Sequence, residues 1–340
     1  MSERIEDIAV AMVAPGKGLL AADESTATIG KRFETIGLES TETSRRDYRE
    51  MLFRANEGMS HISGVILYEE TLFQKAADGT PLVDLIRAAG AVPGIKVDTG
   101  AKPMAHFADE TVTEGLDGLA GRLAKYYEAG ARFAKWRGVL AVSDVLPSAG
   151  AVRANAHALA RYAALCQEAG IVPMIEPEVL MDGTPGDHSI ERSQDVTEYV
   201  LRVTFEELAA QRINLEGMIL KPSMVIDGKK ARKASVDEVA ERTVRVLKNT
   251  VPASVPGITF LSGGQSTEEA TAHLSAMNAD YDLPWPLTFS YGRALQTEGL
   301  TAWGGKPENV AAGQRAFAHR AKMCGLAAKG GWKIELEKAA

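Results

Sequence analysis

The chain has 340 residues, with 38 Lys and Arg against 45 Asp and Glu, which gives a formal net charge of −7. A protein that neutralises phosphate backbones carries a basic excess, so this balance argues against a nucleic-acid-binding protein. Hydrophobic residues make up 45% of the chain and charged residues 24%. That composition is ordinary for a globular protein and excludes intrinsic disorder as the main state.

Neither a disulfide framework, a metal site nor a membrane segment is expected. The two cysteines, Cys166 and Cys324, are too few for a framework or a structural zinc site, and the six histidines show no HExxH spacing. The first seven residues include three acidic ones where a signal peptide would be basic, and no run of about 18 apolar residues occurs. We therefore expect a cytoplasmic protein that does not contact membranes.

Short apolar runs rich in strand-forming residues alternate with segments of helical periodicity, the pattern of a parallel sheet built from βα units. Eight such runs give about 42 residues per unit, which predicts a single-domain α/β fold over 1–340, a (β/α)8 TIM barrel. Within it we expect a helical segment at about 1–15 and a tail at about 325–340. The predicted strands cover residues 18–23, 64–69, 94–98, 133–139, 171–178, 218–224, 258–263 and 287–292.

Local signals predict several helix ends. Ser235 and Ser266 each precede a Glu by three residues, the spacing of a capping box at a helix N-terminus. Gly130 and Gly170 stand where a helix would end, shortly before the next predicted strand. Trp136 is expected to point away from the barrel interior, because side chains alternate along a strand.

Polar residues gather toward the C-terminal ends of the predicted strands. In a barrel the loops at these ends build the active site, whereas strand interiors are apolar. Burying a Lys or a carboxylate costs free energy, so such groups need oppositely charged partners or have a functional role. The residues concerned are Asp23, Lys96, Lys135, Arg137, Glu176, Glu178, Lys221, Ser262, Ser290 and Arg293.

Three of these residues, Lys96, Lys135 and Lys221, converge with the carboxylates. An amine held among other cations and partly desolvated has a lowered pKa, and its free base can attack a carbonyl to form a Schiff base. Nearby carboxylates can move the protons that carbinolamine formation and dehydration require. The alternative from these residues alone is a neutralising salt-bridge network.

The loops after strands seven and eight carry the signal of a phosphate site. Gly263 and Gly264 follow the seventh strand, and Gly292 and Arg293 follow the eighth. Glycine lets backbone N–H groups approach an anion, and Arg adds a paired charge. The basic run at 229–233 is interpreted as a solvated loop rather than a nucleic-acid contact.

At these residues the chain resembles the class I fructose-bisphosphate aldolases, and the similarity runs from Pro15 to Lys306. The motifs that carry the resemblance are LAADEST (20–26), RRDYRE (45–50), GVILYEETLFQKAADG (64–79), GIKVD (94–98), LDGL (116–119), FAKWR (133–137), EPE (176–178), LKPSMV (220–225), GITFLSGGQS (257–266) and LTFSYGRALQ (287–296).

The resemblance implies a role for each candidate residue. Lys221 would form the Schiff base and Glu176 would act as the general acid/base. Asp23 would accept or relay the C4 hydroxyl proton, Lys135 would set the electrostatics, and Glu178 would pair with neighbouring cations. Phosphate-binding positions would be Ser262, Gly263, Gly264, Ser290, Gly292 and Arg293 at the C1 end, and Ser25, Thr28, Arg32, Lys96 and Arg137 at the C6 end.

The implied reaction is the reversible cleavage of fructose 1,6-bisphosphate to dihydroxyacetone phosphate and glyceraldehyde 3-phosphate, in glycolysis and gluconeogenesis, without a metal or other cofactor. A homotetramer is expected by resemblance. Alternatives are another Schiff-base reaction of phosphosugars, such as transaldolase-like chemistry or a preference for fructose 1-phosphate, and a non-catalytic phosphosugar-binding scaffold.

The C-terminus departs from the pattern of vertebrate members, which end in a Tyr that aids proton transfer to the enamine. Here no Tyr follows Tyr291, and the chain ends in LEKAA. We therefore predict that another group or water protonates the enamine, and that removing the last few residues has little effect on turnover. Ser223 and Ala27, which replace an Asn and a Gly of those members, are small changes beside the site.

Overall fold

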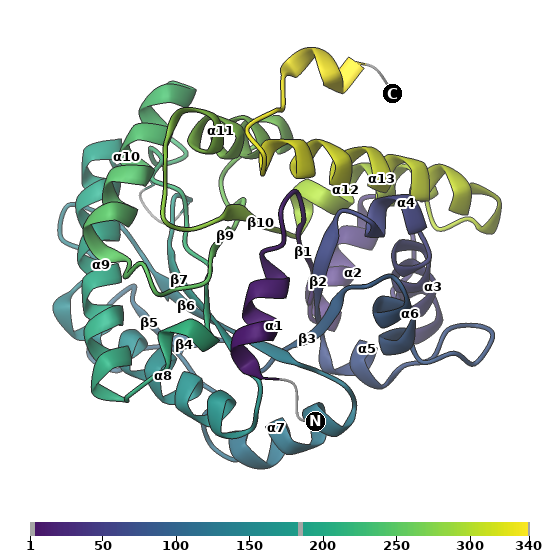
Figure 1. The fold of residues 1–340 in the computed structure, drawn as a ribbon, viewed down its shortest axis with the longest axis horizontal. Helices are drawn as coiled ribbons and strands as arrows, with labels where there is room; N and C mark the ends of the chain where they lie inside the picture. The colour runs from purple at the N-terminus through teal and green to yellow at the C-terminus, as the bar shows by residue number, and fades with distance from the viewer. Residues whose placement is uncertain (1–3, 183–185, 339–340) are drawn as a thin grey trace.

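Eight parallel strands close into a barrel in a computed structural model that describes residues 4–182 and 186–338 (Figure 1). Around the barrel the strands follow the order β1, β10, β9, β8, β7, β6, β3 and β2. Their bounds are β1 Gly18–Ala22, β2 Ile62–Leu67, β3 Val92–Lys96, β6 Phe133–Leu140, β7 Val172–Val179, β8 Ile219–Leu220, β9 Ile258–Phe260 and β10 Leu287–Tyr291. The predicted (β/α)8 barrel is confirmed.

Helices surround the barrel and fill its connections (Figure 1). None in the described ranges is long and apolar enough to cross a membrane. Their bounds are α1 Ile5–Met12, α2 Thr26–Glu34, α3 Glu42–Phe53, α4 Asn56–Met59, α5 Glu69–Phe73, α6 Leu82–Ala88, α7 Leu119–Glu128, α8 Ala149–Glu168, α9 Ile190–Ala210, α10 Val236–Thr250, α11 Thr267–Asp280, α12 Arg293–Trp303 and α13 Val310–Ala327, with 3-10 turns at Leu215–Gly217, Pro307–Asn309 and Ile334–Lys338.

The eight strands are the eight that the apolar runs predict, but two of them, β8 and β9, are shorter by three residues or more. The sixth run was expected to extend over 218–224, whereas β8 ends at Leu220. Pro222 has no N–H to continue the ladder, and the chain leaves the sheet after Lys221, whose N–H still donates to the Ile175 carbonyl at 2.7 Å. Strand β9 likewise stops at Phe260, before the turn at 262–265.

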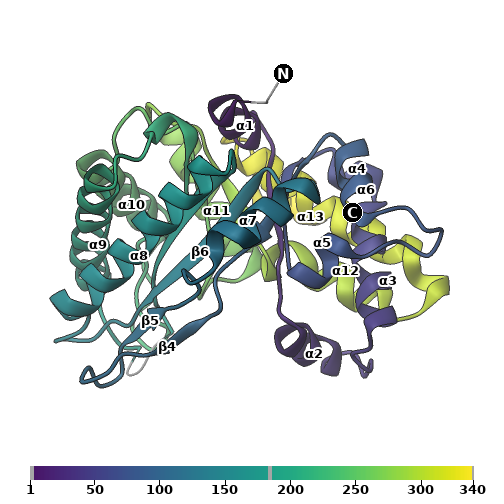
Figure 2. The ribbon, with the colours of Figure 1, turned by 90° about the horizontal axis from the view of Figure 1, so that it is seen from below.

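A small antiparallel hairpin, β4 Ala101–Pro103 with β5 Thr111–Thr113, has no counterpart among the predicted strands. Each of its strands has three residues, and β4 is exposed. Strands this short leave too few residues to show an alternating pattern. The hairpin extends from the barrel at the end where α2 lies (Figure 2).

Most of the predicted helix ends are found. Ser266 and Glu269 form a complete capping box on α11, whereas Ser235 accepts only the N–H of Glu238 on α10. Gly130 and Gly170 follow the last turns of α7 and α8 with φ of 108° and 70°, a conformation that costs glycine little. The expected N-terminal helix is α1; residues 1–3, 183–185 and 339–340 lie outside the described part.

Apolar side chains fill the end of the barrel where the strands begin. Leu19, Phe133, Val172 and Ile219 cluster with Met12 and other buried residues of α1, so this helix covers that end, opposite α2 (Figure 2). The Phe133 ring occupies the space beside Gly94, where an added Cβ would lie 2.3 Å from it. Because Gly94 has no side chain, one large ring fits at the barrel axis.

Outward-facing strand residues pack against the helices. Trp136 is fully buried and its ring lies 5.5 Å from that of Tyr162 on α8, so it points away from the barrel interior as predicted. Cys166 and Cys324 are both buried and unpaired.

Candidate active site

Two lysines and two carboxylates meet inside the barrel where four strands end. Lys221 Nζ lies 3.0 Å from Glu176 Oε1, and Lys135 Nζ lies 2.9 Å from Glu176 Oε2 and 3.0 Å from Asp23 Oδ2. The side chains of Lys221, Lys135 and Glu176 are each at most 7% exposed, and that of Asp23 is 13% exposed. Glu176 therefore bridges the two lysines in a nearly dry environment.

The two lysines differ in their protonation because their partners differ. Burial lowers the pKa of Lys221, and the nearby Lys135 ammonium adds to this, although Glu176 opposes it. Burial also disfavours the charge on Lys135, but Asp23, Glu176 and Asp98 together raise its pKa. Lys221 is thus the lysine that gives up its proton more readily, while Lys135 remains an ammonium ion.

The two carboxylates of the cluster stay ionised. Burial alone would raise the pKa of Asp23 and of Glu176, but the surrounding cations, Lys135 first among them, lower both values. A carboxylate held between two lysine side chains can accept a proton from one reacting group and return it to another. The geometry therefore suits proton transfer at Lys221.

Asp98 is a member of the site that the sequence analysis did not single out. It lies two residues after Lys96, and its Oδ2 is buried without a hydrogen-bond partner among the described residues. Burial raises its pKa, against the attraction of Lys135 and Lys96. Side chains alternate along the GIKVD strand, so Lys96 and Asp98 lie on the same face. This alternation could have identified Asp98 from the sequence.

A cavity of about 290 Å³, called here the α2-side cavity, opens between the cluster and α2. Asp23 and Lys135 form part of its wall. Lys96 and Arg137 reach it from β3 and β6, and Arg32 reaches it from α2. Its predicted phosphate-binding residues are Ser25, Thr28, Arg32, Lys96, Arg137 and Gly292.

A second cavity of about 700 Å³, the α11-side cavity, lies over the ends of β7, β9 and β10. Glu178 pairs there with Arg137, and Arg293 Nη2 donates to the Gln265 carbonyl at 3.2 Å. Gly264 has φ of 74°, and an added Cβ would lie 2.0 Å from Met181 Cγ, so only glycine fits this turn. Its predicted phosphate-binding residues are Arg32, Arg137, Ser262, Gly263, Gly264 and Arg293.

Two predicted residues do not lie where their grouping implied. Gly292 lines the α2-side cavity rather than the one formed by Ser262 and Gly263, because β10 pairs with β1 and brings Gly292 beside Ala21. Ser290 lines neither cavity; it is 1% exposed and its Oγ has no hydrogen-bond partner in the described chain. The other C1-end residues, Ser262, Gly263, Gly264 and Arg293, do lie together.

A buried network behind the site holds Arg32, and sequence reasoning missed it. Glu24 accepts from Arg32, from Arg49 at 2.5 Å and from Gln296 Nε2 at 3.0 Å. Tyr48 in turn donates to Gln296 Oε1 at 3.0 Å. The acidic residue next to Asp23 was visible in the sequence, but its partners come from helices α3 and α12, far along the chain.

Ser223 ties the end of β7 to the segment that carries Lys221. Its hydroxyl donates to the Val179 carbonyl at 3.1 Å and accepts from the Val179 N–H at 3.2 Å. Across residues 4–182 and 186–338, no group of three or more His, Cys, Asp and Glu is arranged to hold a metal ion.

A family model described as fructose-bisphosphate aldolase class-I matches residues 4–340. The chain belongs to this family. A relative from Xanthomonas campestris, named a probable fructose-bisphosphate aldolase class 1, is 55% identical over 97% of this chain and 99% of its own length. The Drosophila melanogaster fructose-bisphosphate aldolase is 52% identical over 97% of this chain and 91% of its own.

A solved structure of the Plasmodium falciparum fructose-bisphosphate aldolase, in complex with TRAP and a small-molecule inhibitor, has the same fold. Its TM-score is 0.95 at 47% identity, and the match covers 97% of this chain and 95% of that one. The resemblance inferred from the sequence motifs is therefore confirmed as family membership, and with it the class of enzyme: a class I aldolase, a carbon–carbon lyase.

Proposed function

We propose that this aldolase cleaves fructose 1,6-bisphosphate reversibly to dihydroxyacetone phosphate and glyceraldehyde 3-phosphate, through a Schiff base on Lys221. The observation that carries the proposal is the contact of Lys221 Nζ with Glu176 at 3.0 Å in a buried cluster that lowers the pKa of Lys221. A free amine beside an ionised carboxylate has both the nucleophile and the proton acceptor that imine formation needs.

In the first half-reaction the Lys221 amine adds to the C2 carbonyl. Glu176 transfers the protons that convert the carbinolamine to an iminium ion, and one water molecule leaves. Asp23 accepts the proton of the C4 hydroxyl, and the electrons of the C3–C4 bond flow to the iminium nitrogen. Glyceraldehyde 3-phosphate leaves, and the resulting enamine remains on Lys221.

In the second half-reaction the enamine takes a proton at C3, and water hydrolyses the imine to release dihydroxyacetone phosphate. Lys135 remains an ammonium ion between Asp23 and Glu176 throughout, which keeps both carboxylates ionised and ready to accept protons.

The phosphates are assigned to the two cavities that flank the cluster. Ser262, Gly263, Gly264 and Arg293 would bind the C1 phosphate in the α11-side cavity, and Ser25, Thr28, Arg32 and Lys96 the C6 phosphate in the α2-side cavity. Lys96 lines the α2-side cavity and Arg293 lines the α11-side cavity, and this cation on each side supports a substrate with an anionic group at each end. The C1-end roles that the resemblance implies for Ser290 and Gly292 stay predictions, since neither residue lines the α11-side cavity.

Borohydride reduction in the presence of dihydroxyacetone phosphate, followed by peptide mass mapping, tests the proposal. We expect one reduced adduct, on Lys221, and none on the equally buried Lys135. Lys221→Met should abolish both the adduct and cleavage, while activity of the native enzyme should persist in excess EDTA. An unmodified Lys221 in an active preparation would rule out the Schiff base.

We further propose a single-domain, cytoplasmic homotetramer. Two Arabidopsis thaliana relatives at 53% and 54% identity are named cytosolic fructose-bisphosphate aldolases, which supports the compartment, and the tetramer is carried over from the family resemblance. Light scattering coupled to size exclusion should give four times the chain mass; a monomer would contradict the tetramer.

A further inference from the structure

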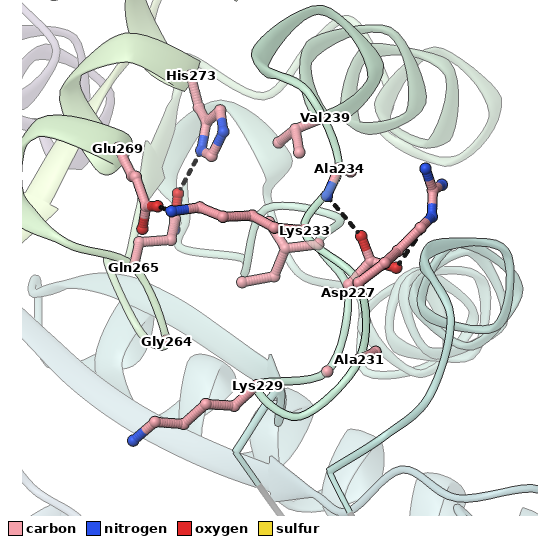
Figure 3. Close-up of a pocket in the computed structure, with 13 residues that line it drawn as sticks. Asp227, Lys229, Ala231, Lys233, Ala234, Val239, Gly264, Gln265, Glu269 and His273 are labelled. Carbon is pink, nitrogen blue, oxygen red and sulfur yellow. Dashed lines mark hydrogen bonds and ion pairs between the residues drawn. The ribbon is translucent and has the colours of Figure 1, made fainter.

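The basic run at 229–233, expected from the sequence to be a solvated loop, contains cations of two kinds. Arg232 lies 2.7 Å from Glu238, and Lys233 pairs with Glu269. Lys229 and Lys230 are exposed, and no side-chain ion pair is found for either in the described part of the chain. Figure 3 shows the Lys229 side chain extending away from the pair formed by Lys233 and Glu269.

Lys229 and Lys230 differ in what they face. Lys229 lines the α11-side cavity together with Ser262, Gly263 and Arg293, whereas Lys230 does not line it. Lys229 also borders a smaller cavity of about 200 Å³, the one drawn in Figure 3. Of two adjacent exposed lysines, only one therefore faces the proposed phosphate site.

The backbone beneath Lys229 is fixed by neighbouring segments. The N–H groups of Gly228, Lys229 and Lys230 donate to the carbonyls of His188, Met181 and Gly186 at 2.7–2.8 Å. Asp227, 7% exposed, closes the base of the loop by accepting from Ala234 N–H at 2.9 Å. This turn is also packed too closely for a side chain at Gly228, whose added Cβ would lie 2.5 Å from the Gly186 carbonyl oxygen.

The α11-side cavity has few cations that are free to bind an anion. Four acidic residues line it, and two of its cations are engaged, Arg32 with Glu24 and Arg137 with Glu178. Arg293 and Lys229 are left to meet an incoming anion. The acidic lining residues are Glu178, Asp182, Glu268 and Glu298. A phosphate monoester entering among them gains from each cation that it can contact.

We propose that Lys229 is a further phosphate-contacting residue of the α11-side cavity, which Arg293 also lines. This inference rests on the proposed function for the identity of the substrate, since the ligand is its C1 phosphate. Lys229 raises affinity for a substrate phosphorylated at that end and takes no part in proton transfer, because the acid/base groups are those around Lys221.

The test compares Lys229→Ala with Lys230→Ala, the matched control, in the full-length chain. Calorimetric titration with inorganic phosphate should show binding weakened about 3- to 10-fold in Lys229→Ala and unchanged in Lys230→Ala. The KM for fructose 1,6-bisphosphate should rise by the same factor with kcat within about twofold. Lys229→Arg should restore most of the affinity, and added salt should narrow the difference.

The outcomes separate this inference from the proposed function. Equal phosphate affinity in the wild type and Lys229→Ala would overturn the role of Lys229, even if cleavage and the Lys221 adduct are normal. An absent adduct with phosphate binding that still depends on Lys229 would overturn the Schiff-base proposal and leave the anion site standing. A fall in kcat at constant KM would also count against Lys229 as a binding residue.

Discussion

The two ends of the barrel are built from the same strands but have opposite chemistry. Along β7 the inward position changes from Met174 to Glu176, and across β8 from Ile219 to Lys221. One step of the strand repeat, two residues, separates an apolar layer from a charged one. The apolar layer beneath Lys221 excludes water from one side of it, and this burial is the first cause of its lowered pKa.

This contrast separates two contributions of the barrel core. At the closed end, burial of apolar side chains stabilises the fold without touching the reacting groups. At the open end, buried charges are costly and are held only because each has an opposite partner. Substitutions at the apolar end should therefore act on stability alone, whereas substitutions at the charged end should act first on turnover.

The largest effect is expected for Glu176→Gln at the charged end. The amide keeps the shape of the side chain but cannot accept a proton, so kcat should fall about 10²- to 10⁴-fold. Steady-state cleavage of fructose 1,6-bisphosphate measures this. Glu178→Gln is the matched control. Because Glu178 pairs with Arg137, whereas Glu176 contacts Lys221, this substitution should lower kcat far less. Equal losses for both variants would contradict the distinct role of Glu176.

The next effect is expected at the apolar end, for Phe133→Ala. The ring is fully buried, and truncating a buried Phe costs about 3–5 kcal/mol of unfolding free energy. Chemical denaturation measures the loss, and kcat per folded molecule should stay within about threefold of the wild type. A collapse of kcat in a variant that remains folded would show that the two ends are not independent.

Much of the open end was predictable because charged residues inside apolar strand runs are rare. Lys135, Glu176 and Lys221 stand out for that reason, and the barrel geometry brings them together once eight strands are recognised. The apolar runs that predict those strands are long enough to show their pattern. The three-residue strands of the β4–β5 hairpin are not, so that element appears only in the structure.

The rest depends on contacts that no local pattern specifies. Glu24 meets Gln296 across 272 positions of sequence. Gly292 lies in the α2-side cavity because closure of the barrel pairs its strand with the first one. Lys229 and Lys230 are identical neighbours in the sequence, and only the fixed backbone of the loop decides which of them faces the α11-side cavity.

Asp23→Asn should lower turnover, because Asp23 accepts the C4 hydroxyl proton in the proposed mechanism. Its effect on stability is smaller than that of Phe133→Ala and depends on pH. The pKa of Asp23 lies below its ordinary value of 3.8 in the folded chain, so the ionised form stabilises the fold at pH above 3.8. The free energy of unfolding of the wild type should exceed that of the variant by about 2–3 kcal/mol at pH 7. This margin should shrink as the pH falls below 3.8, because protons then bind the unfolded chain first.

Urea denaturation of both proteins at pH 7 and pH 3 measures the margin. Combining Asp23→Asn with Lys135→Met forms a double-mutant cycle, and most of the margin should disappear when the partner at 3.0 Å is already absent. A margin that is constant with pH would mean that Asp23 acts through packing rather than through its charge.

The smallest effect is expected far from both ends of the barrel, for a chain truncated after Ile334. The removed segment includes Glu337, which pairs with the buried Arg320 on α13 and accepts from Trp332 Nε1 at 2.7 Å. Arg320 would keep its hydrogen bond to Thr271 at 3.0 Å, so the loss of stability should be about 1–2 kcal/mol. Turnover should stay within about twofold, because the segment carries no Tyr to protonate the enamine.

Thermal unfolding and steady-state cleavage test the two parts of this expectation separately. Glu337→Gln should lower the melting temperature nearly as much as the truncation, since the carboxylate makes the contacts that hold the segment to α13. A more than tenfold drop in cleavage for the truncated chain, with Glu337→Gln unaffected, would place a function in the terminal residues themselves. The chemistry of this aldolase would then extend beyond the open end of the barrel to its C-terminal tail.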